Sequence, residues 1–456
     1  MLAATYSRLD RLRLSAFSWF RTPRRHEKAS LYLHGLFTVH VLVFALVVWG
    51  TAVTTPYLDM LTWQHDALEA LKANEATVWF GHLLHPHNEH RLAFVRVLTL
   101  LDLTFGGGRE TIFIMTTLLA VIVIAGLLWR VMTEHARAKD RLLALVIPML
   151  ILSSTAALDI GLPINCVYPL SLVFSVAAIV IFARAATAPR NNSRLLMGAM
   201  LCALLSPFGN MTGLVIWPVL TWLCWRSQAG WRISLITLFL GTSESCLYLW
   251  HDLPVHASGG IQLGLGAVMR LGVYAGVFLG LPFSRLATFT IPAIGLGWGL
   301  ALVASAILVA DCLNKKPATR ATLVSTGLIL IGLGVAAMAS LGRVDESADL
   351  VAPARYSIYV VLFHTGLVMR VLLWFRTRPD RARPLGLKTG MGFATLLLLF
   401  QVVSGLAGLK AANDLRDVVM SWQPGLHGAH YTKLVFPDLS YAEAVRRDVD
   451  AYLLAR

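Results

Sequence analysis

The stretch TIFIMTTLLAVIVIAGLLW, residues 111–129, decides the class of fold. It carries no charged residue, and a helix that crosses the hydrocarbon core of a bilayer needs roughly 20 such residues. Hydrophobic residues make up 57% of the chain and charged residues only 14%. The sequence therefore predicts an all-α polytopic membrane protein. Its apolar runs lie near residues 32–53, 109–131, 142–160, 165–184, 194–207, 208–225, 232–250, 287–311, 321–341, 356–376 and 388–409.

The basic residues predict how the chain is threaded through the membrane. The net charge is +14, and arginines and lysines are concentrated in residues 1–31, before the first apolar run. The positive-inside rule places this segment in the cytoplasm, where it can also contact anionic lipids. The first run has no small-residue cleavage site, so we expect a retained signal anchor. The charge follows topology and does not predict nucleic-acid binding.

Two apolar stretches are not expected to span the membrane. Residues 92–107 contain Arg96 and Asp102, and we expect an amphipathic helix at the outer interface. Residues 265–282 contain Arg270, and we expect a re-entrant segment lining a protein cavity. This threading keeps every basic cluster inside.

The resulting topology has about eleven transmembrane helices in a domain spanning residues 32–409. The N-terminus is inside, and a tail of residues 410–456 faces outward. The tail contains a capping-box pattern, Ser440-Tyr441-Ala442-Glu443, which predicts a short amphipathic helix with a structural role. The five cysteines are scattered and predict neither a metal site nor a disulfide framework.

The first outward loop, residues 54–108, carries the main indication of function. Its stretch HPHNEHR, residues 85–91, gathers titratable groups beside the hydrocarbon region. One interpretation is a zinc site of His85, His87 and His90, although their spacing matches no recognised helical metal motif. Another is a polar junction before a helix. A third is the rim of an active site, with Glu89 as acid or base and Arg91 as phosphate clamp.

Asp59 lies early in the same loop, just after the first span. A carboxylate there can act as a general base or orient an acceptor hydroxyl. It can equally cap the helix predicted from Trp63 to Lys72.

Arginines near the outer mouth also need a reason, because the positive-inside rule expects few of them there. Arg343 and Arg355 flank a loop, and arginine grips phosphate oxygens through a two-pronged hydrogen-bond donor. The alternative is salt bridging to Asp345, Glu346 and Asp349. Arg270, within an apolar run, must face a cavity or an anion.

Together these features resemble the integral-membrane glycosyltransferases of the GT-C superfamily. Those enzymes have many spans and a long first outward loop that supplies an acidic catalytic residue, the position that Asp59 matches. Three short stretches are similar to an uncharacterised bacterial branch: Asn88–Leu92, Ser206–Asn210 through Trp217-Pro218, and Gly342-Arg343 through Arg355-Tyr356.

The resemblance implies a polyprenyl-phosphate sugar as donor and a glycan or lipid as acceptor. The reaction would be an inverting hexosyl or pentosyl transfer at the periplasmic face of the bacterial inner membrane, for the cell envelope. Asp59 would be the base and Glu89 or His90 its helper. The first outward loop contains no Asp-x-Asp motif and Met60 follows Asp59, so no metal is expected. Nor is any other cofactor.

The resemblance further implies a binding set for the lipid-linked donor. Arg343 and Arg355 would clamp its phosphate, with Arg91, Arg270 and Tyr356 completing the substrate-binding residues. Membrane lipids are the other expected partners.

Two rival functions remain open. A transporter or flippase of a lipid-linked glycan would share the spans and the arginines, but it would be expected to show buried charges through the bilayer and a symmetric repeat. A structural or assembly subunit would leave the first-loop cluster unexplained.

Overall fold

The computed structural model describes residues 25–73, 75–87, 90–134, 136–188, 192–227, 229–250, 265–281, 290–342, 354–377, 383–421 and 439–455. These residues form helices, and the extended pairing among them is one isolated antiparallel bridge between His87 and His90. The elements are α2 (Arg25–Thr51), α3 (Asp59–Ala73), α4 (Ala76–Leu84), α5 (Ala93–Leu101), η2 (Asp102–Gly106), α6 (Thr111–Thr133), α7 (Ala138–Leu143), α8 (Val146–Ile151), α9 (Ser154–Gly161), η3 (Pro163–Cys166), α10 (Val167–Ala186), α11 (Ser193–Leu205), η4 (Ser206–Phe208), η5 (Met211–Val215), α12 (Ile216–Ser227), α13 (Trp231–Leu249), α14 (Leu265–Leu279), α16 (Thr290–Leu313), α17 (Arg320–Gly342), η7 (Ala354–Tyr356), α18 (Ser357–Thr377), α19 (Arg383–Ser421) and α21 (Leu439–Leu454).

Within these ranges, seven helices are long and apolar enough to cross a membrane. Each coincides with an apolar run that was expected to span, so the prediction of an all-α, multi-pass membrane protein is confirmed at that level. The seven are Lys28–Thr51, Thr111–Thr133, Pro163–Ala186, Ile291–Leu313, Arg320–Gly342, Ser357–Thr377 and Gly386–Asp417.

The other four predicted spans, eleven less these seven, are shorter or less apolar. The run at 142–160 is divided among α7, α8 and α9. Pro148 lies in the first turn of α8, where its missing N–H leaves no helical bond unmade. The helices α11, α12 and α13 have 13, 12 and 19 residues. The count of eleven therefore stays a prediction.

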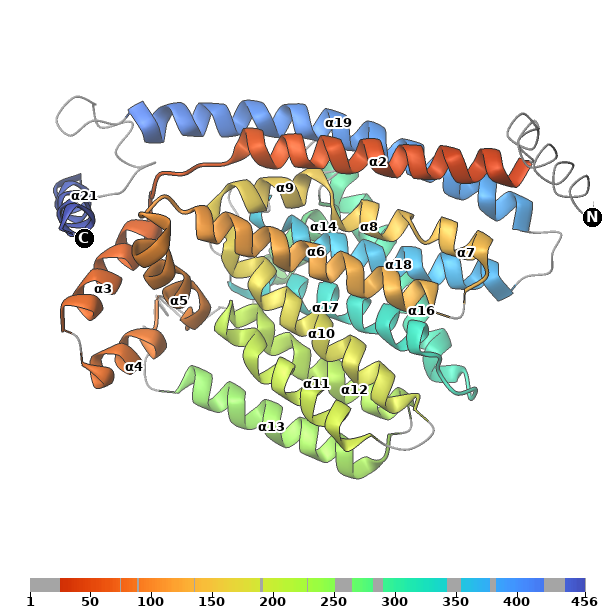
Figure 1. The fold of residues 1–456 in the computed structure, drawn as a ribbon. Helices are drawn as coiled ribbons and strands as arrows, with labels where there is room; N and C mark the ends of the chain where they lie inside the picture. The colour runs from red at the N-terminus through yellow and green to blue at the C-terminus, as the bar shows by residue number, and fades with distance from the viewer. Residues whose placement is uncertain are drawn as a thin grey trace, which may run out of the picture.

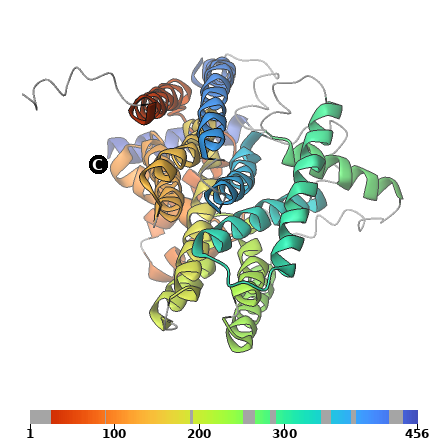
Figure 2. The same ribbon diagram turned by 90° about the vertical axis from the view of Figure 1, so that its right-hand side faces the viewer.

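The long helices lie along one another and enclose a common apolar core. α2 and α19 run side by side at one edge, where the Tyr32 hydroxyl lies 2.7 Å from Thr395 Oγ1 (Figure 1). Figure 2 views both helices end-on and places α14 and α16 on the opposite flank from α2. The largest fully buried side chains include Tyr359, Phe363 and Phe182, on the central helices α18 and α10.

The first-loop helices α3, α4 and α5 gather at one end of the molecule together with α21 (Figure 1). They share a second small core with it, so the amphipathic helix expected in the tail is confirmed and covers α3. This core contains Leu61, Ala67, Leu68, Leu100 and Leu103 from the loop, and Ala442, Val445 and Val449 from α21.

Arg96 and Asp102, which interrupt the apolar stretch 92–107, are buried anchors of this loop. The Arg96 guanidinium donates to the His82 carbonyl and lies 3.7 Å from the Asp66 carboxylate. Asp102 accepts hydrogen bonds from the backbone N–H groups of Glu110 and Ile112, at 2.9 and 3.2 Å, and so caps the start of α6. These charges fix the loop against the first helix that follows it.

Candidate functional site

A cavity of about 240 Å³ lies where the first loop meets the helix bundle. Its walls come from segments that are far apart in the sequence, and one of them is the predicted first outward loop. They include Asp59 and Trp63 of α3, His87 and His90 of the following loop, Asn165 and Tyr168 at the start of α10, Asn210 and Thr212 before α12, Gly342 at the end of α17, and Arg355 and Tyr356 of η7.

The structure brings four of the residues expected from the sequence into this one pocket. Asp59, His90, Arg355 and Tyr356 all line it. Glu89 and Arg343 lie outside the described residues.

Asp59 is presented by the first turn of α3. The preceding residue, Leu58, has a φ of 51°, a left-handed conformation that is uncommon for a residue with a branched side chain. The helix then starts at once, with the Met60 N–H donating to the Tyr57 carbonyl at 3.2 Å. This sharp entry places the carboxylate of Asp59 at the pocket wall.

The charges around Asp59 keep its carboxyl group ionised. Its pKa is lowered mainly by the interaction with His87, and further by the positive charge of Arg355 and of His90 when protonated, while partial burial opposes the shift. Asp59 Oδ2 lies 3.5 Å from His87 Nε2, an ion-pair distance that is long for a hydrogen bond. At neutral pH the pocket therefore holds one carboxylate facing imidazoles and a guanidinium.

The two histidines are held by their backbones. The His87 N–H donates to the His90 carbonyl at 2.7 Å, and the His90 N–H returns a bond to His87 at 3.0 Å. The His87 ring meets Trp63 edge-on, with 6.0 Å between ring centroids. Trp63 in turn stacks on Phe113 of α6. The imidazole of His87 is thus mounted on a rigid part of the fold.

Arg355 supplies the cationic wall. Its guanidinium carbon lies 5.8 Å from the centroid of the Tyr356 ring, within reach of a cation–π contact. Among the described residues, its Nε is buried and has no hydrogen-bond acceptor. Tyr356 is itself wedged against Tyr168 and Phe278, each with 5.6 Å between centroids. The guanidinium therefore has an unused donor beside a fixed aromatic platform.

A neutral polar wall faces these charges. The Asn210 side-chain oxygen accepts hydrogen bonds from Thr212 N at 3.0 Å and Thr212 Oγ1 at 2.8 Å. The Tyr359 hydroxyl lies 2.5 Å from Thr212 Oγ1 and can donate to it. On the neighbouring segment, Asn165 Nδ2 donates to Asp159 Oδ1 at 3.3 Å.

Close packing explains why the sequence bends at this wall. A Cβ at Gly209 would lie 2.5 Å from the backbone nitrogen of Ser171, and one at Gly213 would lie 2.5 Å from the Ser206 carbonyl carbon. Only glycine fits at such contacts. The stretch from Ser206–Asn210 through Trp217-Pro218, which contains Thr212, was singled out from the sequence, but Asn165, Tyr168 and Trp63 were not assigned to the site. Their only signal was polarity or aromaticity near the end of an apolar run.

Two arginines of the expected binding set lie elsewhere. The Arg91 guanidinium donates to the carbonyls of Leu84, Tyr248 and Trp250 at 2.9, 3.2 and 3.1 Å. Arg91 therefore ties the first loop to the end of α13. Arg270 is exposed on α14 and does not line the pocket.

Nothing in the described part of the chain groups three His, Cys, Asp or Glu side chains as metal ligands. His85 is exposed and does not line the pocket that His87 and His90 share. The three histidines of the zinc interpretation therefore do not line one common pocket.

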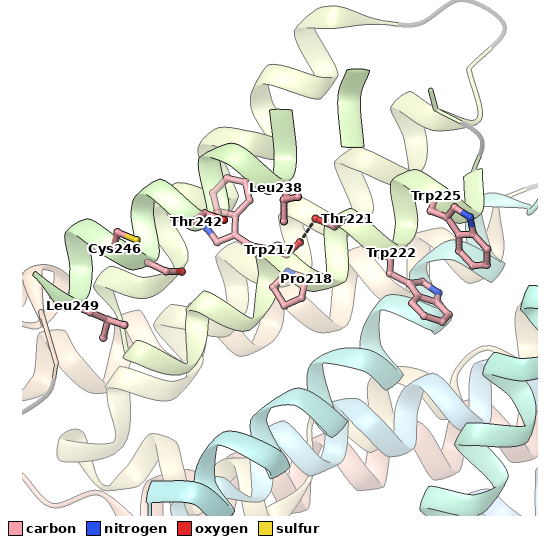
Figure 3. Close-up of a pocket in the computed structure, with 11 residues that line it drawn as sticks. Trp217, Pro218, Thr221, Trp222, Trp225, Leu238, Thr242, Cys246 and Leu249 are labelled. Carbon is pink, nitrogen blue, oxygen red and sulfur yellow. Dashed lines mark hydrogen bonds between the residues drawn. The ribbon is translucent and has the colours of Figure 1, made fainter. Parts of the chain in front are cut away.

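A larger hollow of about 710 Å³ lies between α12 and α13. Figure 3 shows Trp222 and Trp225 toward one end of it and Leu249 at the other. Among the lining residues that the structure describes there is no carboxylate, imidazole or cation. Glu244 lies nearby, but its carboxylate accepts a 2.5 Å hydrogen bond from Trp217 Nε1. This hollow is an apolar groove and holds little means of doing chemistry.

The smaller pocket is thus the candidate site. It combines an ionised carboxylate, two imidazoles, a guanidinium and a neutral polar wall, which suits acid–base chemistry on a ligand that carries both an anion and hydroxyl groups. No family model matches the chain, and no similar curated protein or solved structure was found, so its function has to be argued from this pocket.

Proposed function

We propose that the protein is a membrane glycosyltransferase that moves a sugar from a polyprenyl-phosphate donor to a glycan or lipid acceptor. The pocket would open at the periplasmic face of a bacterial inner membrane, with the N-terminus in the cytoplasm and the tail outside. The observation that carries the proposal is the meeting of Asp59 and Arg355 in one pocket, beside two imidazoles.

The proposed reaction is an in-line displacement at the anomeric carbon. The acceptor oxygen forms a bond to that carbon as the bond to the donor phosphate oxygen breaks, and the configuration inverts. The acceptor proton passes to the acid–base pair of Asp59 and His87, and the bonding electrons leave with the phosphate. Arg355 stabilises the charge that develops on the leaving phosphate.

The composition of the pocket supports this chemistry. A guanidinium with an unused donor suits a phosphate, because charge-assisted hydrogen bonds are roughly twice as strong as neutral ones. Asn165, Asn210 and Thr212 offer uncharged donors and acceptors to sugar hydroxyls. Trp63, Tyr168 and Tyr356 offer the aromatic surface beside them.

The test uses the purified protein in lipid nanodiscs with polyprenyl phosphates that carry labelled hexoses or pentoses. Bacterial membranes serve as the source of acceptors, and release of polyprenyl phosphate and transfer of label are both measured. The proposal expects transfer with inversion, and loss of transfer in Asp59→Asn and Arg355→Ala. Absence of transfer from every donor, or undiminished transfer by both variants, would overturn it.

A transporter of a lipid-linked glycan is the second candidate, and one observation favours it. Arg370 of α18 pairs with Asp311 of α16 and with the Thr326 hydroxyl of α17, all within apolar helices. Transporters bury such charges. Reconstituted vesicles decide between the candidates. A transporter should flip a fluorescent polyprenyl-phosphate sugar, lose this flipping in Arg370→Met/Asp311→Leu and keep it in Asp59→Asn. The enzyme should instead show glycosyl transfer that is lost in Asp59→Asn.

A further inference from the structure

Asp59 and His87 form a pair in which the imidazole lies deeper than the carboxylate. The two side chains approach to 3.5 Å, and they are 14% exposed for His87 against 51% for Asp59. The imidazole is therefore the more enclosed of the two groups, and it lines the same pocket as Asn210 and Arg355.

The imidazole is also the better oriented of the two. Trp63 packs edge-on against its ring, and the two backbone hydrogen bonds between His87 and His90 fix the backbone of the residue. Nε2 is buried and lies 3.5 Å from Asp59 Oδ2, so Nδ1 is the nitrogen that we assign to proton exchange with a ligand. A carboxylate that holds one nitrogen of a histidine while the other handles the proton is a recurring arrangement in hydroxyl activation.

The surroundings of Asp59 make it a weak base. Its pKa is lowered first by His87 and then by the charges of Arg355 and His90, so the carboxylate has a low affinity for a proton. A general base is most effective when the pKa of its conjugate acid lies near the working pH, and the lowered pKa of Asp59 moves that carboxylate away from it. The pair therefore divides the work between a proton acceptor and a fixed anion.

Resting on the proposed function, we propose that His87 Nδ1 accepts the proton of the acceptor hydroxyl and that Asp59 is the positioning residue that holds the ring. The acceptor oxygen loses its proton to Nδ1 as it bonds to the anomeric carbon, and the carbon–oxygen bond to the phosphate breaks. The electron pair leaves on the phosphate. The imidazolium that results is neutralised by the Asp59 carboxylate.

The other charged and titratable groups around His87 fit these roles. His90 lies on the same turn, Arg355 on η7, and the phenols of Tyr168 and Tyr356 line the same pocket. The positive charge of Arg355 disfavours the imidazolium form of His87, so the proton passes on to solvent after transfer. Among the lining residues that the structure describes, Asp59 is the single carboxylate.

Replacement of His87 tests the assignment against a matched neighbour. His87→Gln should lower transfer from labelled polyprenyl-phosphate hexose by about a hundredfold or more. His85→Gln, two residues away but exposed and outside the pocket, should leave it unchanged. His87→Ala should recover part of its rate when free imidazole is added, and the gain should grow with the fraction of imidazole in its neutral form. Less than a tenfold loss in His87→Gln, or no rescue, overturns the assignment.

A second measurement does not depend on activity. Nitrogen NMR of protein labelled at histidine should find the His87 proton on Nε2, facing Asp59, and a mixture of tautomers in Asp59→Asn. A proton on Nδ1 in the wild type would overturn the pairing. Failure of the wild type to use any polyprenyl-phosphate donor would instead overturn the proposed function, while the Nε2 tautomer would still establish the pair.

Discussion

The polar pocket and the apolar groove differ in almost every property except that both are hollow. The groove is about three times larger, at about 710 Å³ against about 240 Å³. It is walled mostly by tryptophans and other apolar side chains, whereas the pocket gathers Asp59, His87, His90 and Arg355. Volume alone would have chosen the groove. The chemistry of the lining favours the pocket, because it places a carboxylate with a lowered pKa beside imidazoles and a guanidinium, and such a cluster in a cleft is a candidate functional site.

The two hollows also differ in how they are assembled. The groove lies between α12 and α13, neighbours in the sequence that pack through Gly241 and Trp217. The pocket needs α3, the loop after α4, the start of α10, the η4–η5 segment, the end of α17 and η7. A local pair of helices can form a groove by itself, but the pocket exists only when the whole bundle is folded.

The largest expected effect separates the hollows by activity. Asp59→Asn should lower glycosyl transfer by about a hundredfold or more. It should cost less than about 1 kcal/mol of stability, because asparagine retains most of the helix-start function. Thr242→Val in the groove is the control and should keep the wild-type rate. Near-normal transfer by Asp59→Asn, with the melting temperature unchanged, would leave Asp59 a helix cap.

The next effect concerns the donor phosphate. Arg355→Ala should weaken binding of polyprenyl monophosphate by roughly tenfold to a hundredfold, the range of a hydrogen bond to a charged group. Arg355→Lys should weaken it less, since lysine keeps the charge and loses the planar pair of donors. Arg270→Ala, exposed on α14, provides the comparison. If Arg270→Ala has the larger effect in a binding titration, the donor site lies on that flank and the pocket assignment fails.

A third effect belongs to the groove and is one of stability. A Cβ at Gly241 would lie 2.6 Å from Trp217 Cβ, so Gly241→Ala should force α12 and α13 apart and cost about 1–3 kcal/mol. Gly126→Ala on α6 is the matched control, because nothing lies within 4 Å of its Cβ. Thermal unfolding in detergent measures both. A change in transfer rate per folded molecule in Gly241→Ala would show that displacement of α13 reaches the pocket.

The smallest effect is a pH dependence of folding stability that arises from His82 of α4, in the first loop. Burial, reinforced by Arg96, lowers the pKa of His82 to about 4. The unfolded chain then binds more protons than the folded one between about pH 6.5 and pH 4, so stability falls as the pH drops through that window. His82→Gln should remove about 1–2 kcal/mol of this loss at pH 5.

Exposed His85→Gln is the comparison for that measurement: the charge of His85 adds to the lowering of the pKa of His82, so its replacement should change the slope of stability against pH in the same direction as His82→Gln but by less. Urea unfolding at several pH values gives the slopes. Equal slopes in the wild type and His82→Gln would mean that His82 is not held neutral by the fold.

Hydropathy and charge predicted much of this architecture. Each of the seven long apolar helices lies in an expected run, and the predicted first loop contains Asp59, His87 and His90, which the structure brings into one pocket. The remaining four runs could not be decided by hydropathy, because breaks such as the one before Pro148 depend on packing between helices.

The site was only half visible in the sequence. Asp59, His90, Arg355 and Tyr356 stand out because charge or polarity beside a membrane is costly and therefore informative. Asn165 and Thr212 are ordinary residues in short turns, and only their bonds to Asp159 and Asn210 show them as a wall. Arg91 stood out equally well, yet its guanidinium is occupied by three backbone carbonyls.

Tyr248 makes the two hollows mechanically dependent on each other. Its hydroxyl accepts a hydrogen bond from the Arg91 N–H at 2.8 Å and donates one to the Pro207 carbonyl at 3.2 Å, while the next residue, Leu249, lines the groove. A ligand that wedges α13 away from α12 must therefore break these bonds or drag both the His90 turn and the Asn210 segment with it. A movement of α13 at the groove would therefore be transmitted to the pocket through the hydrogen bonds of Tyr248.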